Sequence, residues 1–295
     1  MKKKFLTKAE LMIFAGATML LSVILAVSGT LQHYKREREM YEEARRLYLV
    51  ESAEARDYAM GEVDIKRYSY TDGPRVAGAS REYVKENASG DEDSEEADMF
   101  GVPWYDMVEV DFEDLMGINR DICGWIYFEN EKISYPLLYS KDNMNYLRTA
   151  YDGRSARSGS IFLDGGCEMD LTGRNSIIYG HNMRDLSMFG RLRYYRTKKD
   201  YYEDHQYFQI LNEDHKYRYR IFAFYTVSAE DDQGPFVRNF DSKKEFDSFI
   251  QDSINRSLTD TDVEVGTSDH LVTLSTCVND DSKRFVVQAV LVDMD

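Results

Sequence analysis

The side chain with the most reactive chemistry in this sequence is the thiol of Cys277. It ends the β-like run Leu271-Val-Thr-Leu-Ser-Thr-Cys277 and precedes the polar stretch 278–283. Strand ends are places where reactive groups gain access to a substrate. An unperturbed thiol has a pKa of about 8.5 and is mostly protonated at neutral pH, so a nucleophilic cysteine needs a base or a positive neighbour. Cys277 is therefore a candidate nucleophile if such a partner lies near it.

His181 is the best candidate for that partner among five histidines. It follows the apolar run Ser176-Ile-Ile-Tyr-Gly180, and Gly180 together with Asn182 predicts that a strand ends here and opens into a loop. An imidazole beside a thiol sets its ionisation and can protonate a leaving amine. The other histidines fall in a spacer, on the surface or at the start of a strand: His33, His205, His215 and His270.

Arg284 could supply a positive charge to the same site. It comes seven residues after Cys277 and opens the strand-like run Phe285 to Val292, so a hairpin would bring it back beside the thiol. A fixed cation aimed at the oxyanion of acyl transfer is worth about 3 kcal/mol or more. In the alternative interpretation Arg284 is a surface residue that forms an exposed ion pair with Asp280 or Asp281. Such a pair stabilises the fold by about 0 to 1 kcal/mol. The spacing between Cys277 and Arg284 does not decide between these two interpretations.

The elements that must position these side chains are mostly strands. Short runs rich in Ile, Val, Phe and Tyr, separated by turn signals, predict strands at residues 124–128, 132–138, 159–163, 176–179, 217–227, 271–275 and 285–292. Seven such segments indicate a closed or nearly closed sheet. A helix is predicted at Val110 to Met116, and another at Ser242 to Ser257, whose apolar stripe should face the core.

The N-terminus predicts export from the cytoplasm. Leu11 to Leu31 is an uncharged, mostly apolar run of 21 residues, about 31 Å as a helix, which matches a hydrocarbon core of roughly 30 Å. Lysines at positions 2, 3, 4 and 8 favour a cytoplasmic N-terminus. A cleaved signal peptide is the alternative, because Ala26 and Ser28 lie near the end of the run. Both interpretations place the rest of the chain outside the cell.

Between this run and the strands the sequence resembles a stalk. Residues from Gln32 to about Met60 are rich in Glu, Arg, Ala and Leu, with opposite charges at helical spacing, which predicts a solvated helix. Residues 61–99 have little apolar periodicity and carry an acidic run, which predicts a flexible linker. We therefore expect a tip and anchor at 1–31, a stalk at 32–99 and a folded domain at 100–295.

Composition excludes several classes of function. The 53 acidic residues exceed the 37 basic ones, giving a net charge of −16, which would repel nucleic acid. The three cysteines are too scattered for a disulfide framework or a thiolate zinc site. Motifs for metal hydrolysis and for nucleotide phosphates are missing from the sequence, so we expect no metal and no cofactor. Cys123 is expected in an apolar strand, and Cys167 in an exposed loop.

Together the motifs carry a resemblance to a known family. The runs Thr273-Leu-Ser-Thr-Cys277 and Ile178-Tyr-Gly-His-Asn-Met183, with Arg284 opening the following strand, resemble the active site of a sortase, more narrowly one of class B. Four further runs occur in the order that this family uses: Ile118 to Ile126, Ile133 to Leu137, Asp142 to Leu147 and Gly159 to Asp164. The match covers about residues 108 to 292. In combination these motifs are far more specific than any one of them.

The resemblance implies an eight-stranded β-barrel with a few peripheral helices and a cysteine transpeptidase, single-pass in the cell membrane, with its catalytic domain outside. Its thiol would cleave the sorting signal near the C-terminus of a surface protein after Thr, and an amine from a cell-wall peptide or a pilin would then take the acyl group. His181 would donate and accept protons, and Arg284 would hold the peptide and the oxyanion. The family positions also imply substrate contacts at Asn143, Leu147, Tyr179 and Ser275.

Two rival functions stay open at this point. Water could replace the amine at the same thioacyl intermediate, which would make the protein a cysteine endopeptidase that releases surface proteins. The chain could also be a catalytically idle, membrane-anchored assembly module. The first rival predicts free acid as the product even when amine is present, whereas the second predicts that Cys277→Ala and His181→Ala change nothing.

Overall fold

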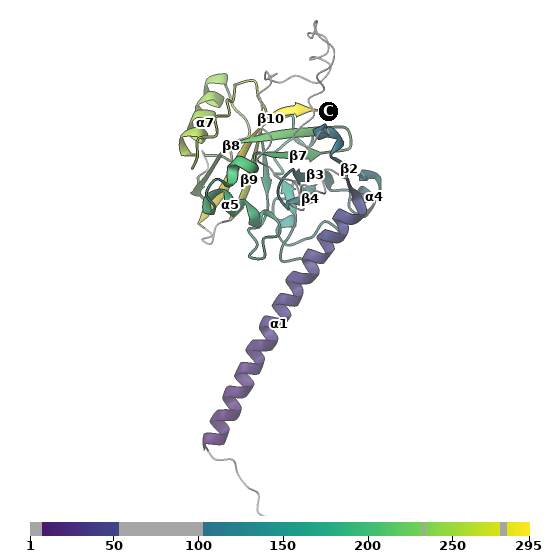
Figure 1. Cartoon of the computed structure of the whole chain (residues 1–295), viewed down its shortest axis with the longest axis vertical. Coiled ribbons are helices and arrows are strands. Elements are labelled where there is room, and N and C mark those ends of the chain that lie inside the picture. Colours follow the sequence, from purple (N-terminus) through teal and green to yellow (C-terminus); the bar gives the residue numbers. More distant parts are fainter. Residues whose placement is uncertain (1–7, 53–102, 232–233, 278–281) are drawn as a thin grey trace, which may run out of the picture. The chain divides into compact units, whose positions relative to one another are not determined.

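The computed structural model (Figure 1) describes residues 8–52, 103–231, 234–277 and 282–295. Its contacts divide the chain into two units, residues 1–42 and residues 43–295. The acidic linker expected at 61–99 lies outside the described residues. The folded domain expected from residue 100 belongs to the second unit.

One helix, α1 (Lys8–Tyr48), dominates the N-terminal part of the chain. Its 41 residues would extend about 62 Å, roughly twice the thickness of a hydrocarbon core. Within it, Gly16–Tyr48 is long and apolar enough to cross a membrane by length and composition, and none of its most apolar stretch is buried. A signal sequence near an N-terminus meets the same criterion. The helix is therefore compatible with both interpretations of the N-terminus.

The stalk helix that we expected to reach about Met60 ends earlier. After Tyr48 the chain forms the short strand β1 (Leu49–Glu51), which pairs antiparallel with β2 (Val108–Val110). The Nη2 atom of Arg45 donates to Oε1 of Glu51 at 2.5 Å, across the junction between helix and strand. The expectation was wrong for residues 49–51, because their strand partner lies more than fifty residues away in sequence and left no local signal. Residues 53–60 lie outside the described part.

The second unit contains the predicted barrel. Its strands are β3 (Ile122–Phe128), β4 (Ser134–Tyr139), β5 (Ile161–Leu163), β6 (Asn175–Tyr179), β7 (Tyr207–Leu211), β8 (Lys216–Ser228), β9 (Leu271–Cys277) and β10 (Lys283–Met294). They close in the order β10-β8-β7-β3-β4-β5-β6-β9. The pairs β4–β5 and β6–β9 are parallel and the other pairs are antiparallel. This confirms a mostly β, eight-stranded barrel.

All seven predicted strands are present, but the eighth, β7, was missed. Its short apolar run is interrupted by Gln209, which is fully buried and whose Nε2 donates to Oε1 of Glu129 at 3.1 Å and to the carbonyl of Trp104 at 3.1 Å. A polar residue at the centre of a five-residue strand removes the alternation on which strand prediction depends.

Short helices join the strands. They are η2 (Trp104–Asp106), α4 (Phe112–Ile118), η3 (Asn145–Leu147), η4 (Phe189–Arg193), α5 (Tyr194–Thr197) and α6 (Tyr201–Asp204). The helix predicted at 110–116 begins two residues later, because the side chain of Asp111 caps it by accepting from the backbone N–H of Asp114 at 3.1 Å. Val110 belongs to β2 instead.

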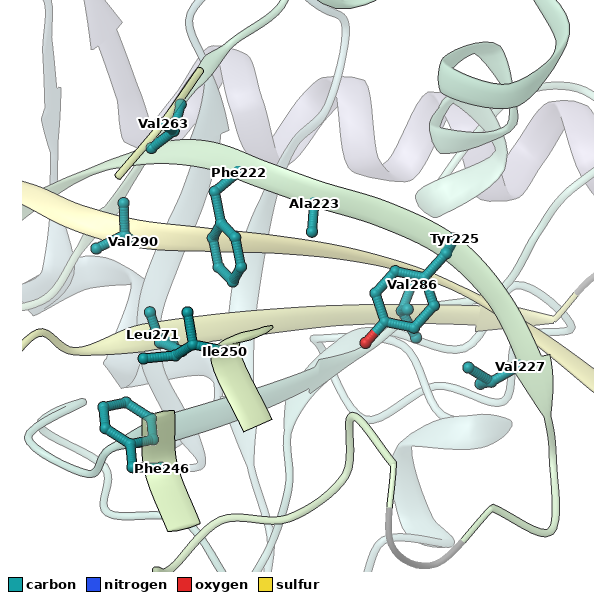
Figure 2. Close-up of a cluster of buried hydrophobic side chains, with 10 residues drawn as sticks. All are labelled: Phe222, Ala223, Tyr225, Val227, Phe246, Ile250, Val263, Leu271, Val286 and Val290. Carbon is teal, nitrogen blue, oxygen red and sulfur yellow. The ribbon is translucent and has the colours of Figure 1, made fainter. Parts of the chain in front are cut away.

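The helix predicted at 242–257 is α7 (Lys243–Arg256), with Ser242 as its N-cap. Figure 2 shows Phe246 and Ile250 projecting from α7 toward side chains of β8, β9 and β10. The cluster is apolar and almost fully buried: Phe222, Ala223, Tyr225, Val227, Phe246, Ile250, Val263, Leu271, Val286 and Val290. The predicted core-facing stripe is confirmed, and α7 covers part of the outer surface of the barrel. We call these ten residues the α7 cluster.

Candidate active site

The strand pairing brings Cys277 and Arg284 together. β9 and β10 form an antiparallel hairpin in which the two residues are direct partners. The predicted hairpin is therefore present. Nη1 of Arg284 donates to the carbonyl of Lys283 at 3.1 Å. Asp280 and Asp281, which the alternative interpretation would pair with Arg284, lie outside the described residues.

β6 brings His181 to the same end of the sheet. It runs parallel to β9, with Tyr179 opposite Ser275, and the N–H of Gly180 donates to the carbonyl of Ser275 at 3.1 Å. His181 is the next residue, at the point where the loop begins. His181 comes two residues after Tyr179, and Cys277 comes two residues after its partner Ser275. Because β6 and β9 run in the same direction, His181 and Cys277 lie at the same end of the sheet. The predicted strand end at Gly180 is confirmed.

The imidazole of His181 is held by one backbone carbonyl. Its Nε2 atom lies 2.9 Å from the carbonyl oxygen of Leu147, in the 3-10 turn η3. A carbonyl oxygen can only accept a hydrogen bond, so Nε2 must carry the proton. In the neutral ring the lone pair is then on Nδ1. The arrangement leaves Nδ1 to accept or donate the proton that a reaction would need.

The backbone of His181 is fixed as firmly as its ring. Its carbonyl accepts from the N–H of Phe189 at 3.1 Å, which closes the loop 181–189. Nε of Arg193 donates to the carbonyl of Gly190 at 2.7 Å, and Nη2 donates to Oδ1 of Asn182 at 2.6 Å. The buried Met188 has a positive φ of 51°, a strained conformation that only a well-determined environment sustains. Sequence reasoning missed Arg193, for which no motif gave a signal.

Two of the predicted substrate contacts, Asn143 and Tyr179, meet at one buried carboxylate. Asp164, directly after β5, is 2% exposed. Its Oδ2 atom accepts from Nδ2 of Asn143 at 2.9 Å and from Oη of Tyr179 at 3.0 Å. Burial, and then the charge of Asp164, raises the pKa of Tyr179. The phenol therefore stays a hydrogen-bond donor at neutral pH.

The other oxygen of Asp164 faces two further donors. Its Oδ1 atom accepts from the backbone N–H of Gly166 at 2.8 Å and from Nη1 of Arg238 at 3.0 Å. Arg238 belongs to the connection between β8 and α7. We call Asp164, Asn143, Tyr179 and Arg238 the Asp164 cluster. Sequence reasoning assigned no role to Asp164, although this residue ends the family run Gly159 to Asp164, and no sequence signal pointed to Arg238.

The other two predicted contacts lie in different settings. Leu147 is half-buried and reaches His181 through its backbone carbonyl. Ser275 is 2% exposed, and its Oγ atom has no hydrogen-bond partner among the residues that the structure describes. A buried hydroxyl without a partner is costly, and this atom is closed to solvent in the described structure.

The remaining cysteines do not belong to the site. Burial raises the pKa of Cys123 to about 12 and that of Cys167 to about 11. The expectation that Cys167 is exposed was wrong: it is 9% exposed, because its loop folds back onto β6 and its Sγ accepts from the N–H of Ile177 at 3.4 Å. Within the described ranges, no group of three His, Cys, Asp or Glu side chains could hold a metal ion.

Known proteins share this sequence and this fold. The profile of the Sortase domain matches residues 133–292. Sortase B of Staphylococcus aureus is 33% identical over 63% of this chain and 76% of its own, and sortase B of Listeria monocytogenes is 36% identical over 63% and 75%. The structure of a Staphylococcus aureus sortase B–substrate complex superposes with a TM-score of 0.58 at 33% identity, covering 62% of this chain and 84% of that one. The chain therefore belongs to the sortase family of cysteine transpeptidases, and its relatives are of class B.

Proposed function

We propose that this sortase is anchored in the cell membrane with its catalytic domain outside, cleaves a C-terminal sorting signal after Thr, and joins the surface protein to an amine of the cell wall or of a pilin. The observation that carries the proposal is the strand register. It brings the positions of Cys277, His181 and Arg284 to one end of three adjacent strands, β6, β9 and β10. Acyl transfer needs a nucleophile, a proton carrier and an oxyanion donor in one place.

The first half of the reaction would proceed as follows. Nδ1 of His181 first takes the proton of the Cys277 thiol, and the thiolate so formed attacks the carbonyl carbon of the Thr in the sorting signal, forming an S–C bond and an oxyanion. The C–N bond then breaks, and Nδ1 of His181 gives its proton to the departing amine. A thioacyl enzyme remains. The hydrogen bond from Nε2 to Leu147 keeps the ring in the tautomer that leaves Nδ1 for this transfer.

The second half reverses the roles. An incoming amine gives its proton to Nδ1 of His181 and attacks the thioacyl carbon, and the S–C bond breaks as the new amide forms. Arg284, as the cross-strand partner of Cys277, would stabilise the oxyanion in both halves. Such a cation also raises the thiolate fraction of the cysteine.

The substrate contacts remain the four that the family positions imply. Among them, Ser275 lies two residues before Cys277 on β9, where the resemblance implies a contact with the sorting signal. Asn143 and Tyr179 would contact the peptide from the edge of the Asp164 cluster, while Leu147 contributes its side chain to the same site. In the proposed layout residues 1–31 form the tip and anchor, 32–99 the stalk and 100–295 the catalytic domain.

The test uses the full chain in detergent with a sorting peptide and an amine. We expect an amide product from the native chain and none from Cys277→Ala. Serine at position 277 serves as a matched control of similar size and much weaker nucleophilicity. Equal product from the alanine variant would overturn the proposal. If added amine never diverts the product from free acid to amide, the activity is hydrolysis, and the endopeptidase alternative is correct.

A further inference from the structure

The Asp164 cluster holds the two chain segments that lead to the partners of the hydrogen bond that orients His181. We propose that Asp164 is a positioning residue that holds the His181 imidazole against the carbonyl of Leu147 through two arms, Tyr179 and Asn143. Asp164 itself does not touch the reacting atoms in this scheme. The inference rests on the proposed role of His181 as the proton carrier.

The first arm fixes the strand that carries His181. Oη of Tyr179 donates to Oδ2 of Asp164 at 3.0 Å, and the Tyr179 ring packs against Phe162 with 5.4 Å between ring centroids. Tyr179 is the last residue of β6, two residues before His181. Its hydroxyl therefore fixes the end of β6 from the side away from β9.

The second arm fixes the turn that carries Leu147. Nδ2 of Asn143 donates to Oδ2 of Asp164 at 2.9 Å, while Oδ1 of Asn143 accepts from the N–H of Gly165 at 2.7 Å. From Asn143 the chain passes through consecutive turns, with the N–H of Leu147 bonded to the carbonyl of Met144 at 3.4 Å. A shift at Asn143 is therefore passed to Leu147 over four residues.

The charge of Asp164 suits this task. A buried carboxylate is acceptor-only, so both arms must arrive as donors, which fixes the orientation of the Asn143 amide. Arg238 and the N–H of Gly166 satisfy the other oxygen and compensate the buried negative charge. Because all four bonds converge on one group, the strand and the turn are held relative to each other and do not shift separately.

The substitution Asp164→Asn separates this role from simple packing. It keeps the shape, and the remaining oxygen still accepts from Arg238 and Gly166. The new NH₂ group then faces Nδ2 of Asn143, which can only donate, whereas Oη of Tyr179 can turn from donor to acceptor. Asn143 has no easy flip, because its own oxygen is needed by the N–H of Gly165. The Asn143 arm is therefore broken with little change in volume, while the Tyr179 arm reverses its direction.

The exchange variant Asp164→Asn/Asn143→Asp should restore the cluster. The carboxylate now at position 143 accepts from the N–H of Gly165 and from one hydrogen of the amide at position 164. The second hydrogen of that amide can be donated to Oη of Tyr179. The contacts of position 164 with position 143 and with Tyr179 return with their directions reversed, and the contacts with Gly165, Gly166 and Arg238 keep theirs. Asp269→Asn is the matched control, since Asp269 is also a buried carboxylate that accepts a backbone N–H, at 2.8 Å from Gly266.

The experiment compares the full-length variants in detergent by steady-state kinetics and by NMR of ¹⁵N-ring-labelled histidine, with the His181 signals assigned by their loss in His181→Gln. We expect Asp164→Asn to lower kcat by about 10- to 100-fold with a smaller change in KM, since small misplacements of a catalytic group have effects of this size. Its His181 signals should move from the Nε2–H tautomer toward a mixture. The exchange variant should recover the native His181 signals, which need no substrate, and Asp269→Asn should match the native chain in kinetics and in NMR.

Unchanged kcat and unchanged His181 signals in Asp164→Asn would overturn the inference. So would an exchange variant that melts like the native chain yet keeps the His181 signals of the single variant. If Asp164→Asn does not fold, Tyr179→Phe removes one arm alone and must by itself shift the His181 signals. The NMR readout needs no substrate, so a native chain that fails to make an amide refutes the proposed function and leaves this test intact.

Discussion

The α7 cluster and the Asp164 cluster lie on the same barrel but are held in opposite ways. The first is built almost entirely from apolar side chains such as Phe246, Ile250 and Leu271. The second consists of directed hydrogen bonds to one buried carboxylate. Apolar packing is strong but non-directional, whereas hydrogen bonds fix where atoms point. Close apolar packing therefore holds α7 against the barrel, whereas directed hydrogen bonds orient the side chain proposed for proton transfer.

Loss of His181 should give the largest separation between activity and stability. We expect His181→Ala to lower kcat/KM by about 10³- to 10⁴-fold, because proton transfer to and from both amines is lost. The free energy of unfolding should change little, since one hydrogen bond of a half-buried side chain is removed. Peptide ligation assays and thermal melts measure the two quantities. If His181→Ala loses activity only in proportion to its unfolded fraction, the loss reflects instability, and His181 has no separate role in catalysis.

The reverse is expected in the α7 cluster, where a substitution should lower the stability and leave the activity nearly unchanged. Phe246 is 2% exposed, so Phe246→Ala should lower the free energy of unfolding by about 3 to 5 kcal/mol. Phe249, which is only partly buried against the same cluster, should cost less when it is changed to Ala. The folded fraction of either variant should retain kcat/KM within a few-fold. Denaturant unfolding and kinetics normalised to the folded enzyme test this. A large fall in kcat for Phe246→Ala would show that packing of α7 against the barrel also positions the active site.

Substitutions of Arg284 test whether the oxyanion needs directed N–H donors or only a nearby positive charge. We expect Arg284→Ala to lower kcat/KM by about 10²- to 10³-fold, and Arg284→Lys to recover only part of that loss. A lysine keeps the charge but not the planar fork of N–H donors. Kinetics at several salt concentrations measure the effect. Full activity in the lysine variant would mean that a general positive field is sufficient.

Cys123 and Cys167 predict an effect that is nil at neutral pH and appears only at alkaline pH. Burial raises the pKa of Cys123 and Cys167 in the folded chain above the value in the unfolded chain, about 9 for a thiol. Their contribution to stability is therefore complete below pH 9 and is lost as pH rises toward 11 and 12, by about 1.4 kcal/mol per pH unit for each group. Urea unfolding between pH 8 and 11 measures it, and Cys123→Ala should reduce the slope. A free energy that stays flat to pH 11 in the native chain contradicts this reasoning.

Much of the fold could be predicted because its signals are local. The runs that became β8, β9 and β10 are long and rich in β-branched and aromatic residues, and the stripe of α7 repeats at helical spacing. The end of α1 at Tyr48 was not predictable, because it depends on β2. β7 was missed because the Nε2 atom of its central residue, Gln209, donates to partners that no local pattern reveals.

The candidate site divides in the same way. Cys277 and Arg284 were predictable as partners because a hairpin joins residues close in sequence. The partners of Asp164 come from three distant segments, at Asn143, Tyr179 and Arg238, so that only the folded chain shows their convergence. Cys167 was misplaced for a related reason: a polar neighbourhood in sequence indicates exposure, but its loop folds back onto β6. Convergence from distant segments is the part of a site that sequence patterns leave out.

The most direct measurement of the central claim is mass spectrometry of the full chain during turnover of a sorting peptide. The account predicts an acyl adduct that maps to Cys277, disappears when amine is added, and leaves an equal amount of amide product. Turnover to amide with the adduct on Cys123 or Cys167, or with no adduct on the trapped enzyme, would contradict it.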